Sequence, residues 1–162
     1  MTEIRPLGKA DLPWVKATWV EHWGGDFVLS RGQPHRYENA EGFIAENRGE
    51  KVGLITYEIA GHALEITSFN SFSEKQGIGT SLLAKVIELA WKKGLEKVWL
   101  VTTNDNINAL RFYQKRGFHI VTIRPGQLEE YRKLKPALPK TGENDIPMRD
   151  EIELELILNR PS

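Results

Sequence analysis

Strict alternation of apolar and polar residues marks the last strand that the sequence predicts. Isoleucine or leucine occupies positions 152, 154, 156 and 158, and glutamate occupies positions 151, 153 and 155. A period of two is typical of a strand with one face in the core and one toward solvent, so we expect Glu151–Leu158 to be a half-exposed closing strand. Further strands are predicted at Glu3–Leu7, Phe43–Glu46, Val52–Ile59, Ala63–Phe72, Val98–Val101 and Phe118–Ile123.

Other stretches repeat their apolar residues at helical spacing. After Gly79, apolar residues recur at i, i+1, i+4, i+5, i+8 and i+9 from Leu82, and Lys92-Lys93-Gly94 supplies a stop signal. Val15 and Trp19 mark an earlier helix, which Gly24-Gly25 ends. Two shorter helices are predicted at Asn106–Arg116 and Leu128–Leu134.

Without the short helix Leu128–Leu134, the order of these elements is β-α-β-β-β-α-β-α-β-β, which predicts an α+β fold. Short turns at residues 47–50 and 60–62 make three consecutive strands adjacent and antiparallel. We therefore expect a single domain over residues 1–162, with a mixed, mostly antiparallel sheet of about seven strands flanked by helices.

The segment Asp26–Tyr37 follows neither period. We expect it to be irregular, with Gly32 and Pro34 as turn residues. His35 lies in this segment and is expected in a turn at the surface, like His62. No spacing of histidine, aspartate and glutamate is typical of a metal site, and cysteine ligands are absent, so no metal is expected.

The charge balance, the absence of cysteine and the lack of long apolar runs limit the classes of protein to which the chain can belong. Among 162 residues, 22 Lys and Arg balance 22 Asp and Glu, which argues against a nucleic-acid-binding protein. The absence of cysteine excludes disulfides and thiol nucleophiles. No apolar run approaches the ~18 residues of a membrane span, and the N-terminus has no apolar leader. We expect a cytoplasmic protein with neither nucleic acid nor membrane as a partner.

A glycine-containing loop, SEKQGIGT at residues 73–80, joins a predicted strand to the long helix. Glycines let the backbone approach a ligand, and the first helical N–H groups and the helix dipole favour an anion such as a pyrophosphate. The Rossmann loop requires a third glycine where this chain has Leu82, and the Walker loop requires a Gly-Lys-Ser/Thr that is absent. Taken alone, the loop also fits a tight turn.

A second motif follows one helix and one strand later. Asn106, Ala109 and Tyr113 have the spacing N-x-x-A-x-x-x-Y, and Gly117-Phe118 follows them. Together with the loop residues 76–79, this pattern resembles the GNAT superfamily of acyl-CoA-dependent N-acetyltransferases. The element order agrees with that family over nearly the whole chain.

One loop position departs from the family pattern. The usual Arg or Gln is Glu74 here, and the glycine that often follows it is Lys75. A carboxylate beside a pyrophosphate is unfavourable, so we expect Glu74 to face solvent and Lys75 or Gln76 to help hold the phosphates.

The resemblance implies that acetyl-CoA is the co-substrate and lies in a V-shaped gap between the fourth and fifth strands, here Ala63–Phe72 and Lys97–Thr102. The pyrophosphate is expected on amides from Gln76 to Thr80, and the pantetheine along the strand edge near Phe69 to Ser71. The predicted cofactor-binding residues are Phe69, Ser71, Lys75, Gln76, Gly77, Ile78, Gly79, Thr80, Asn106 and Ala109. Asn106 also suits a helix cap.

Two residues are the catalytic candidates. Tyr113 matches the family's tyrosine that protonates the departing CoA thiolate; the alternative is a core aromatic beside Phe112. Glu65 lies where many relatives carry a catalytic glutamate, and it is our first candidate for the base that takes a proton from the amine. A cross-strand charge pair is its structural alternative, and Glu58 is a weaker rival.

Acceptor selection is expected from the first helix and the loop after it, because aromatic residues gather there. Trp19, Trp23 and Phe27 are predicted to bind the acceptor together with Arg31, which suits an acidic group; core packing is the alternative for the two tryptophans. The predicted reaction is direct acetyl transfer to a primary amine of a small molecule or peptide in a ternary complex. One alternative is a regulatory CoA-binding module without transfer. The other is an interaction domain that pairs through residues 151–158. A homodimer is the assembly that we expect.

Overall fold

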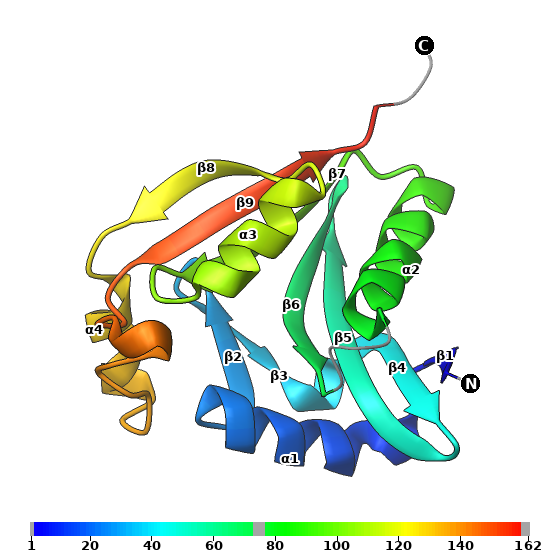
Figure 1. Cartoon of the computed structure of the whole chain (residues 1–162), viewed down its shortest axis with the longest axis horizontal. Helices are drawn as coiled ribbons and strands as arrows, with labels where there is room; N and C mark the ends of the chain where they lie inside the picture. The colour runs from blue at the N-terminus through cyan, green and yellow to red at the C-terminus, as the bar shows by residue number, and fades with distance from the viewer. Residues whose placement is uncertain (1, 73–76, 160–162) are drawn as a thin grey trace.

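The computed structural model describes residues 2–72 and 77–159 (Figure 1). Its strands are β1 (Thr2–Pro6), β2 (Phe27–Ser30), β3 (Gln33–Arg36), β4 (Glu41–Asn47), β5 (Glu50–Ala60), β6 (Ala63–Ser71), β7 (Lys97–Thr103), β8 (His119–Arg124) and β9 (Glu151–Ile157). Its α-helices are α1 (Leu12–Trp23), α2 (Ile78–Lys92), α3 (Ile107–Lys115) and α4 (Gln127–Leu134).

Seven of the strands form one sheet in the order β1-β4-β5-β6-β7-β9-β8. Only β6 and β7 run parallel within it; the other neighbours are antiparallel. The α+β class and the mixed, mostly antiparallel sheet are therefore confirmed. The three consecutive antiparallel strands predicted in the middle of the chain are β4, β5 and β6.

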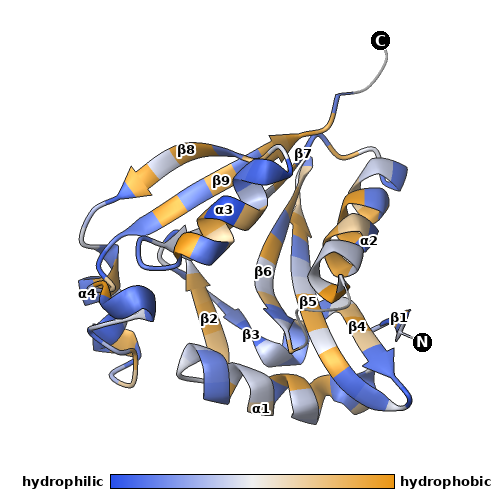
Figure 2. Ribbon diagram, in the orientation of Figure 1, coloured by the Kyte–Doolittle hydropathy of each residue, from blue (hydrophilic) through white to orange (hydrophobic). Residues whose placement is uncertain are grey.

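Helices cover both faces of the sheet. Side chains of a β-strand point to the two faces in turn, so neighbouring residues of one strand pack against different helices. Phe43 and Ala45 of β4 point into a core that they share with α2 and α3. Ile44, between them, joins a second core with Val15 and Trp19 of α1. Figure 2 shows hydrophobic residues along the central strands and on α2.

The strands β6 and β7 are paired only at their first residues, from Ala63 with Lys97 to Ile66 with Leu100. Beyond that point β6 continues to Ser71 while β7 continues to pair with β9 on its other side. The described part of the sheet is therefore open between the C-terminal halves of β6 and β7.

A β-bulge in β6 lies at the start of this opening. Thr56 of β5 is opposite Ser68, and the next residue, Tyr57, is opposite Ile66, which leaves Thr67 as an extra residue. An extra residue reverses which face the following side chains point to. Ser68 accordingly accepts a hydrogen bond from Trp19 of α1, at 2.9 Å, while Phe69 packs against α3.

The prediction that residues 26–37 are irregular is wrong. The strands β2 and β3 form a two-residue hairpin in which Ser30 is opposite Gln33. Arg31 and Gly32 both have positive φ, 50° and 76°, as the tightest hairpin turns require. Pro34 is tolerated because this small sheet has only two strands and both are edges.

The prediction of a half-exposed closing strand is also wrong in its polar face. The strand β9 lies inside the sheet between β7 and β8, and Glu151 and Glu153 are buried. Arg124 donates to both carboxylates, and Arg31 donates to Glu153. Buried carboxylates are tolerated when they are paired in this way.

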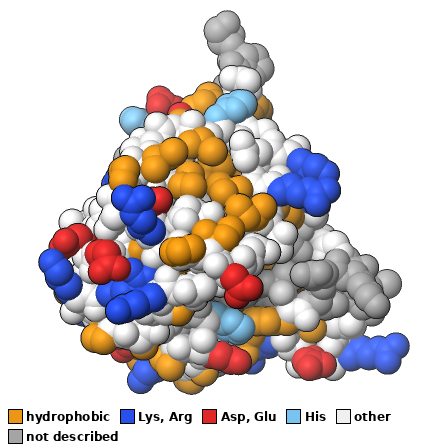
Figure 3. Space-filling view, turned by 60° about the vertical axis from the view of Figure 1, so that its left-hand side comes forward, with side chains coloured by type: hydrophobic (Ala, Val, Ile, Leu, Met, Phe, Trp, Pro, Cys, Tyr) orange, Lys and Arg blue, Asp and Glu red, His pale blue; other side chains and the backbone are white. Residues whose placement is uncertain are grey.

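The strand β8, which lies at one edge of the sheet next to β9, leaves apolar side chains at the surface. Ile120, Val121 and Ile123 are exposed, and Figure 3 shows hydrophobic side chains gathered on this side of the molecule between Lys and Arg side chains. None of the described helices is long and apolar enough to span a membrane.

Candidate active site

A cavity of about 820 Å³ opens where β6 and β7 separate. Its walls come from residues 66–71 of β6 and 100–103 of β7, from the ends of α1 and α3, and from β2, α4 and the loop around Gly142. Structural segments that are far apart in the sequence thus share one concave site, as expected for a ligand pocket.

Four of the predicted cofactor-binding residues line this cavity: Phe69 and Ser71 on β6, and Asn106 and Ala109 at the start of α3. The side chain of Asn106 accepts a hydrogen bond from the Ala109 N–H at 3.1 Å, which confirms its capping role. A capped α3 begins at a fixed place beside the cavity.

The other described loop residues form the first turn of α2. Gly77, with φ of 65°, precedes the helix, and the first helical hydrogen bond runs from the Ser81 N–H to the Gly77 carbonyl at 3.0 Å. The N–H groups of residues 78–80 therefore have no partner within the helix, so Ile78, Gly79 and Thr80 lie where an anion would bind. Glu74, Lys75 and Gln76 lie outside the described residues.

Arg116 is a residue at this end of α2 that our sequence reasoning missed. Its guanidinium donates to the Thr80 hydroxyl at 2.9 Å and lies 3.7 Å from the centre of the Phe112 ring. The signal was a basic residue immediately before the Gly117-Phe118 motif. Arg116 adds a positive charge beside the first-turn N–H groups of α2, which suits a phosphate.

Tyr113 lines the cavity from α3 and is 7% exposed. Its ring packs against Phe112 and Phe118, with centroids 5.3 and 5.4 Å away, and against Phe69 at 6.2 Å. Burial raises the pKa of Tyr113, so the phenol keeps its proton at neutral pH. Tyr113 is thus a packed aromatic residue at the cavity, and its role as a proton donor stays a prediction.

Glu65 is buried on the face of β6 that the β2–β3 hairpin covers. It accepts a hydrogen bond from the Ser30 hydroxyl at 2.5 Å and lies 3.3 Å from Nε2 of His35. Among the described residues, Ile66 and Thr67 line the cavity but Glu65 does not. Its carboxylate therefore lies just behind the cavity wall.

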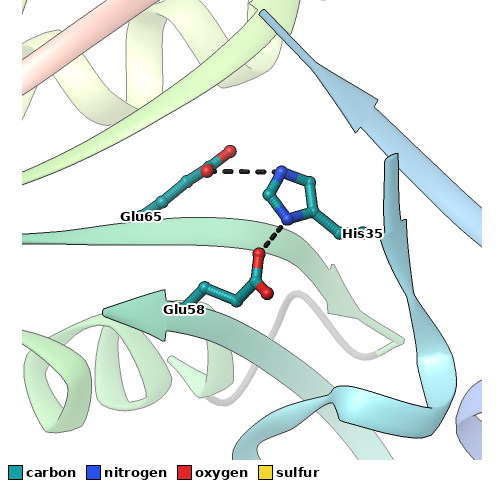
Figure 4. A group of neighbouring side chains, drawn as sticks. All are labelled: His35, Glu58 and Glu65. Carbon is teal, nitrogen blue, oxygen red and sulfur yellow. Dashed lines mark hydrogen bonds and ion pairs between the residues drawn. The ribbon is translucent and has the colours of Figure 1, made fainter. Parts of the chain in front are cut away.

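The expectation that His35 lies in a surface turn is wrong. His35 is in β3, its side chain is 14% exposed, and its ring lies between Glu58 and Glu65 (Figure 4). Candidate metal-ligand atoms of these three residues lie within 4.8 Å of one another, a grouping that sequence spacing did not indicate because the hairpin creates it. Their mutual hydrogen bonds account for the grouping.

The predicted acceptor residues divide between the cavity and the core. Trp23 lines the cavity, whereas Trp19 is buried in the core of α1. Phe27 and Arg31 are not among the described residues of the cavity wall. Arg31 lies 3.6 Å from the Trp99 ring centre and binds the Glu153 carboxylate through two nitrogens.

Polar residues that our sequence reasoning did not select also line the cavity, among them Tyr131, Lys135 and Glu151. The Tyr131 hydroxyl donates to Glu151 at 2.6 Å and accepts a hydrogen bond from the Gly32 N–H at 3.0 Å. Lys135 donates to the Trp23 carbonyl at 2.6 Å, and burial lowers the pKa of Lys135 to about 8. These hydrogen bonds connect Tyr131 of α4 to the β2–β3 hairpin and Lys135, just after α4, to α1. This side of the cavity is therefore built by contacts between distant segments of the chain.

Comparison with known proteins identifies relatives. Residues 11–118 match the model of the acetyltransferase (GNAT) family. The chain is 41% identical over 142 residues to the uncharacterized protein YdhI of Bacillus subtilis (strain 168), covering 87% of this chain and 89% of that protein. It is 29% identical over 133 residues to the ribosomal protein bS18-alanine N-acetyltransferase of Escherichia coli (strain K12), covering 76% and 85%. A GNAT family acetyltransferase from Elizabethkingia anophelis, solved with acetyl-CoA bound, has a TM-score of 0.70 and 25% identity, covering 97% and 98%.

Proposed function

The chain belongs to the acetyltransferase (GNAT) family, and from this premise we propose that it transfers the acetyl group of acetyl-CoA directly to a primary amine of a small molecule or peptide. The observation that carries this proposal is the position of the cavity. It opens where β6 and β7 separate, and it is lined by Phe69, Ser71, Asn106, Ala109 and Tyr113 together.

The co-substrate fits the described residues in two places. The first-turn amides of residues 78–80, which have no partner within the helix, and Arg116 beside them suit the phosphates. The edge of β6 that faces β7 beyond the paired residues, from Thr67 to Asn70, offers backbone groups to the pantetheine amides and to the thioester carbonyl. A backbone N–H on that carbonyl would stabilise the oxyanion that forms during attack.

Proton transfer then requires a base and an acid. An alkyl ammonium, with a pKa near ~10.4, must lose a proton before its nitrogen attacks the thioester carbon. Because the Glu65 carboxylate lies behind the cavity wall, it accepts this proton through one water molecule. The C–S bond breaks as the tetrahedral intermediate collapses, and Tyr113 gives its proton to the CoA sulfur.

Charges in the cavity wall support a cationic acceptor. The described lining residues of the cavity include four carboxylates, from Glu21, Asp105, Glu143 and Glu151, against one lysine, Lys135, and one histidine, His22. The relative named for ribosomal protein bS18 acts on an alanine of that protein, and its name supports including peptides beside small-molecule amines. Acetyl-CoA as co-substrate favours the predicted cytoplasmic location, and the exposed apolar residues of β8 favour the predicted homodimer.

Calorimetric titration with acetyl-CoA and thiol release with an amine panel test the function. We expect binding and, with at least one amine, stoichiometric CoA release. Binding without turnover across the panel would favour the regulatory module. No binding at near-millimolar acetyl-CoA would reject both acetyl transfer and the regulatory module. Glu65→Gln should flatten the acid side of the pH–rate profile, whereas the same loss in Glu151→Gln alone would assign the base to the carboxylate in the wall.

A further inference from the structure

The β2–β3 hairpin brings a histidine to the carboxylate that the proposed reaction uses as its base. The contacts come from three elements: Ser30 and His35 from the hairpin, Glu58 from β5 and Glu65 from β6 (Figure 4). Glu58 and Glu65 are opposite each other in the β5–β6 pair, so a ring placed above this pair can contact both carboxylates. The hairpin supplies that ring.

The hydrogen bonds determine the protonation of the ring. A serine hydroxyl has one hydrogen, and Ser30 uses it on the Glu65 carboxylate at 2.5 Å. The 2.8 Å contact between the Ser30 oxygen and Nε2 of His35 therefore needs a hydrogen on Nε2. Nδ1 faces a carboxylate oxygen of Glu58, which accepts when ionised, so Nδ1 carries a hydrogen as well. A ring with both hydrogens is an imidazolium.

Electrostatics favour the same state. Burial lowers the pKa of His35, but the hydrogen bonds and charges of Glu65 and Glu58 outweigh burial and raise it above the ordinary value of histidine. Arg31 in the hairpin turn is another cation whose charge acts on Glu65. The side chains of His35 and Glu65 are 14% and 8% exposed, whereas that of Glu58 is 44% exposed, so the cluster reaches solvent through Glu58.

We propose that His35, held by Glu58, is a positioning residue that fixes the Glu65 carboxylate and keeps it ionised for its role as the base. This inference rests on the proposed function. The imidazolium acts on Glu65 directly and through Ser30; it does not touch the substrates. A nearby positive charge favours a carboxylate over its protonated form, so the charge of His35 extends catalysis to lower pH. The hairpin, which also lines the cavity with Val28 and Leu29, thus sets the working pH range.

The test compares His35→Gln with a matched control, His62→Gln, in which the exposed histidine of the β5–β6 turn receives the same change. The full chain is assayed for CoA release with the amine it acetylates best, between about pH 5 and pH 9. For His35→Gln we expect the acid limb of kcat to move up by about one pH unit, which lowers kcat about tenfold below the limb's midpoint. KM for acetyl-CoA should stay within twofold, and the control should match the wild type.

A purely structural role of His35 predicts a different result. Loosening the hairpin would lower kcat equally at all pH values or raise KM, with no displacement of the limb. That outcome would overturn the proposal while leaving acetyl transfer intact.

A second measurement does not depend on turnover. NMR titration of the histidine side chains should find His35 doubly protonated at neutral pH, and its titration should move to lower pH in Glu58→Gln and in Glu65→Gln, because each removes a negative neighbour. Glu38→Gln, at an exposed position, is the control. If the enzyme turns over no amine, the proposed function fails on its own. If His35 titrates like His62, or is unmoved by both variants, the positioning role fails whether or not transfer occurs.

Discussion

Replacing Tyr113 with phenylalanine removes the proposed acid and little else. The ring lies among Phe69, Phe112 and Phe118, with centroids 5.3 to 6.2 Å away, and a phenylalanine keeps all of these contacts. Because the substitution deletes only the hydroxyl, the free energy of unfolding should change by less than about 1 kcal/mol. A fall in kcat would then reflect the loss of the proton that the Tyr113 hydroxyl donates.

The size of that effect follows from the leaving group. General acid catalysis contributes about 10²- to 10⁴-fold, and the lower end applies here because a thiol with a pKa near ~8.5 leaves readily as a thiolate. Burial raises the pKa of Tyr113, so wild-type enzyme keeps the phenol protonated throughout the assay range. We expect kcat to fall roughly 100-fold, which corresponds to about 2.7 kcal/mol in the activation free energy.

The assay is CoA release at saturating amine, with the acetyl-CoA affinity measured by calorimetry in parallel. The dissociation constant should stay within about twofold of the wild-type value. Tyr57→Phe is the matched control, because Tyr57 is a buried tyrosine outside the described cavity wall, and it should leave kcat unchanged. A kcat within twofold of wild type in Tyr113→Phe would refute the acid role and leave Tyr113 as a packing residue.

Three further substitutions probe the walls of the site. Arg116→Ala should raise KM for acetyl-CoA about tenfold with kcat unchanged, because it removes a charge-assisted contact to phosphate; steady-state kinetics check this, with the exposed Arg111→Ala as control. A Cβ at residue 142 would lie 2.1 Å from the Asp105 carboxylate, so Gly142→Ala should destabilise the fold by about 1–3 kcal/mol in urea unfolding; equal stability would mean that the loop moves freely. The buried Lys135, with its pKa lowered to about 8, binds fewer protons folded than unfolded between pH 8 and its ordinary value. Wild-type stability should therefore rise by about 1–2 kcal/mol relative to Lys135→Met from pH 8 to ~10.4, and an unchanged difference in calorimetric unfolding would contradict the burial effect.

Local patterns predicted the elements on which the co-substrate site is built. The stripe from Leu82 to Ala90 predicted α2, and Asn106 with Ala109 predicted the cap of α3; both are properties of neighbouring residues along one element. The adjacent, antiparallel arrangement of Val52–Ile59 and Ala63–Phe72 followed from the short turn between them. These features could be predicted because each depends on interactions within a few residues.

The part of the site around the β2–β3 hairpin and β9 was less predictable because it depends on tertiary contacts. Gly32 indicated a turn, but Arg31 before it also has positive φ, which residues other than glycine and asparagine adopt reluctantly, so the sequence did not indicate the two-residue turn of the β2–β3 hairpin. Missing the hairpin also misplaced His35. Glu151 and Glu153 looked solvent-exposed because alternation cannot reveal that Arg31 of the hairpin turn and Arg124 of β8 pair with these carboxylates.

The bulge at Thr67 connects these two sides of the site. With strict alternation along β6, Glu65 and Phe69 would share a face, and one of them would point away from its proposed role. The extra residue places Glu65 and Ser68 toward α1 and the hairpin, and Ile66 and Phe69 toward α2 and α3. It also coincides with the end of β6–β7 pairing. One inserted residue therefore separates the proposed base, Glu65, and His35 from the aromatic face that carries Tyr113, on opposite sides of the gap where we propose that the acetyl group is transferred.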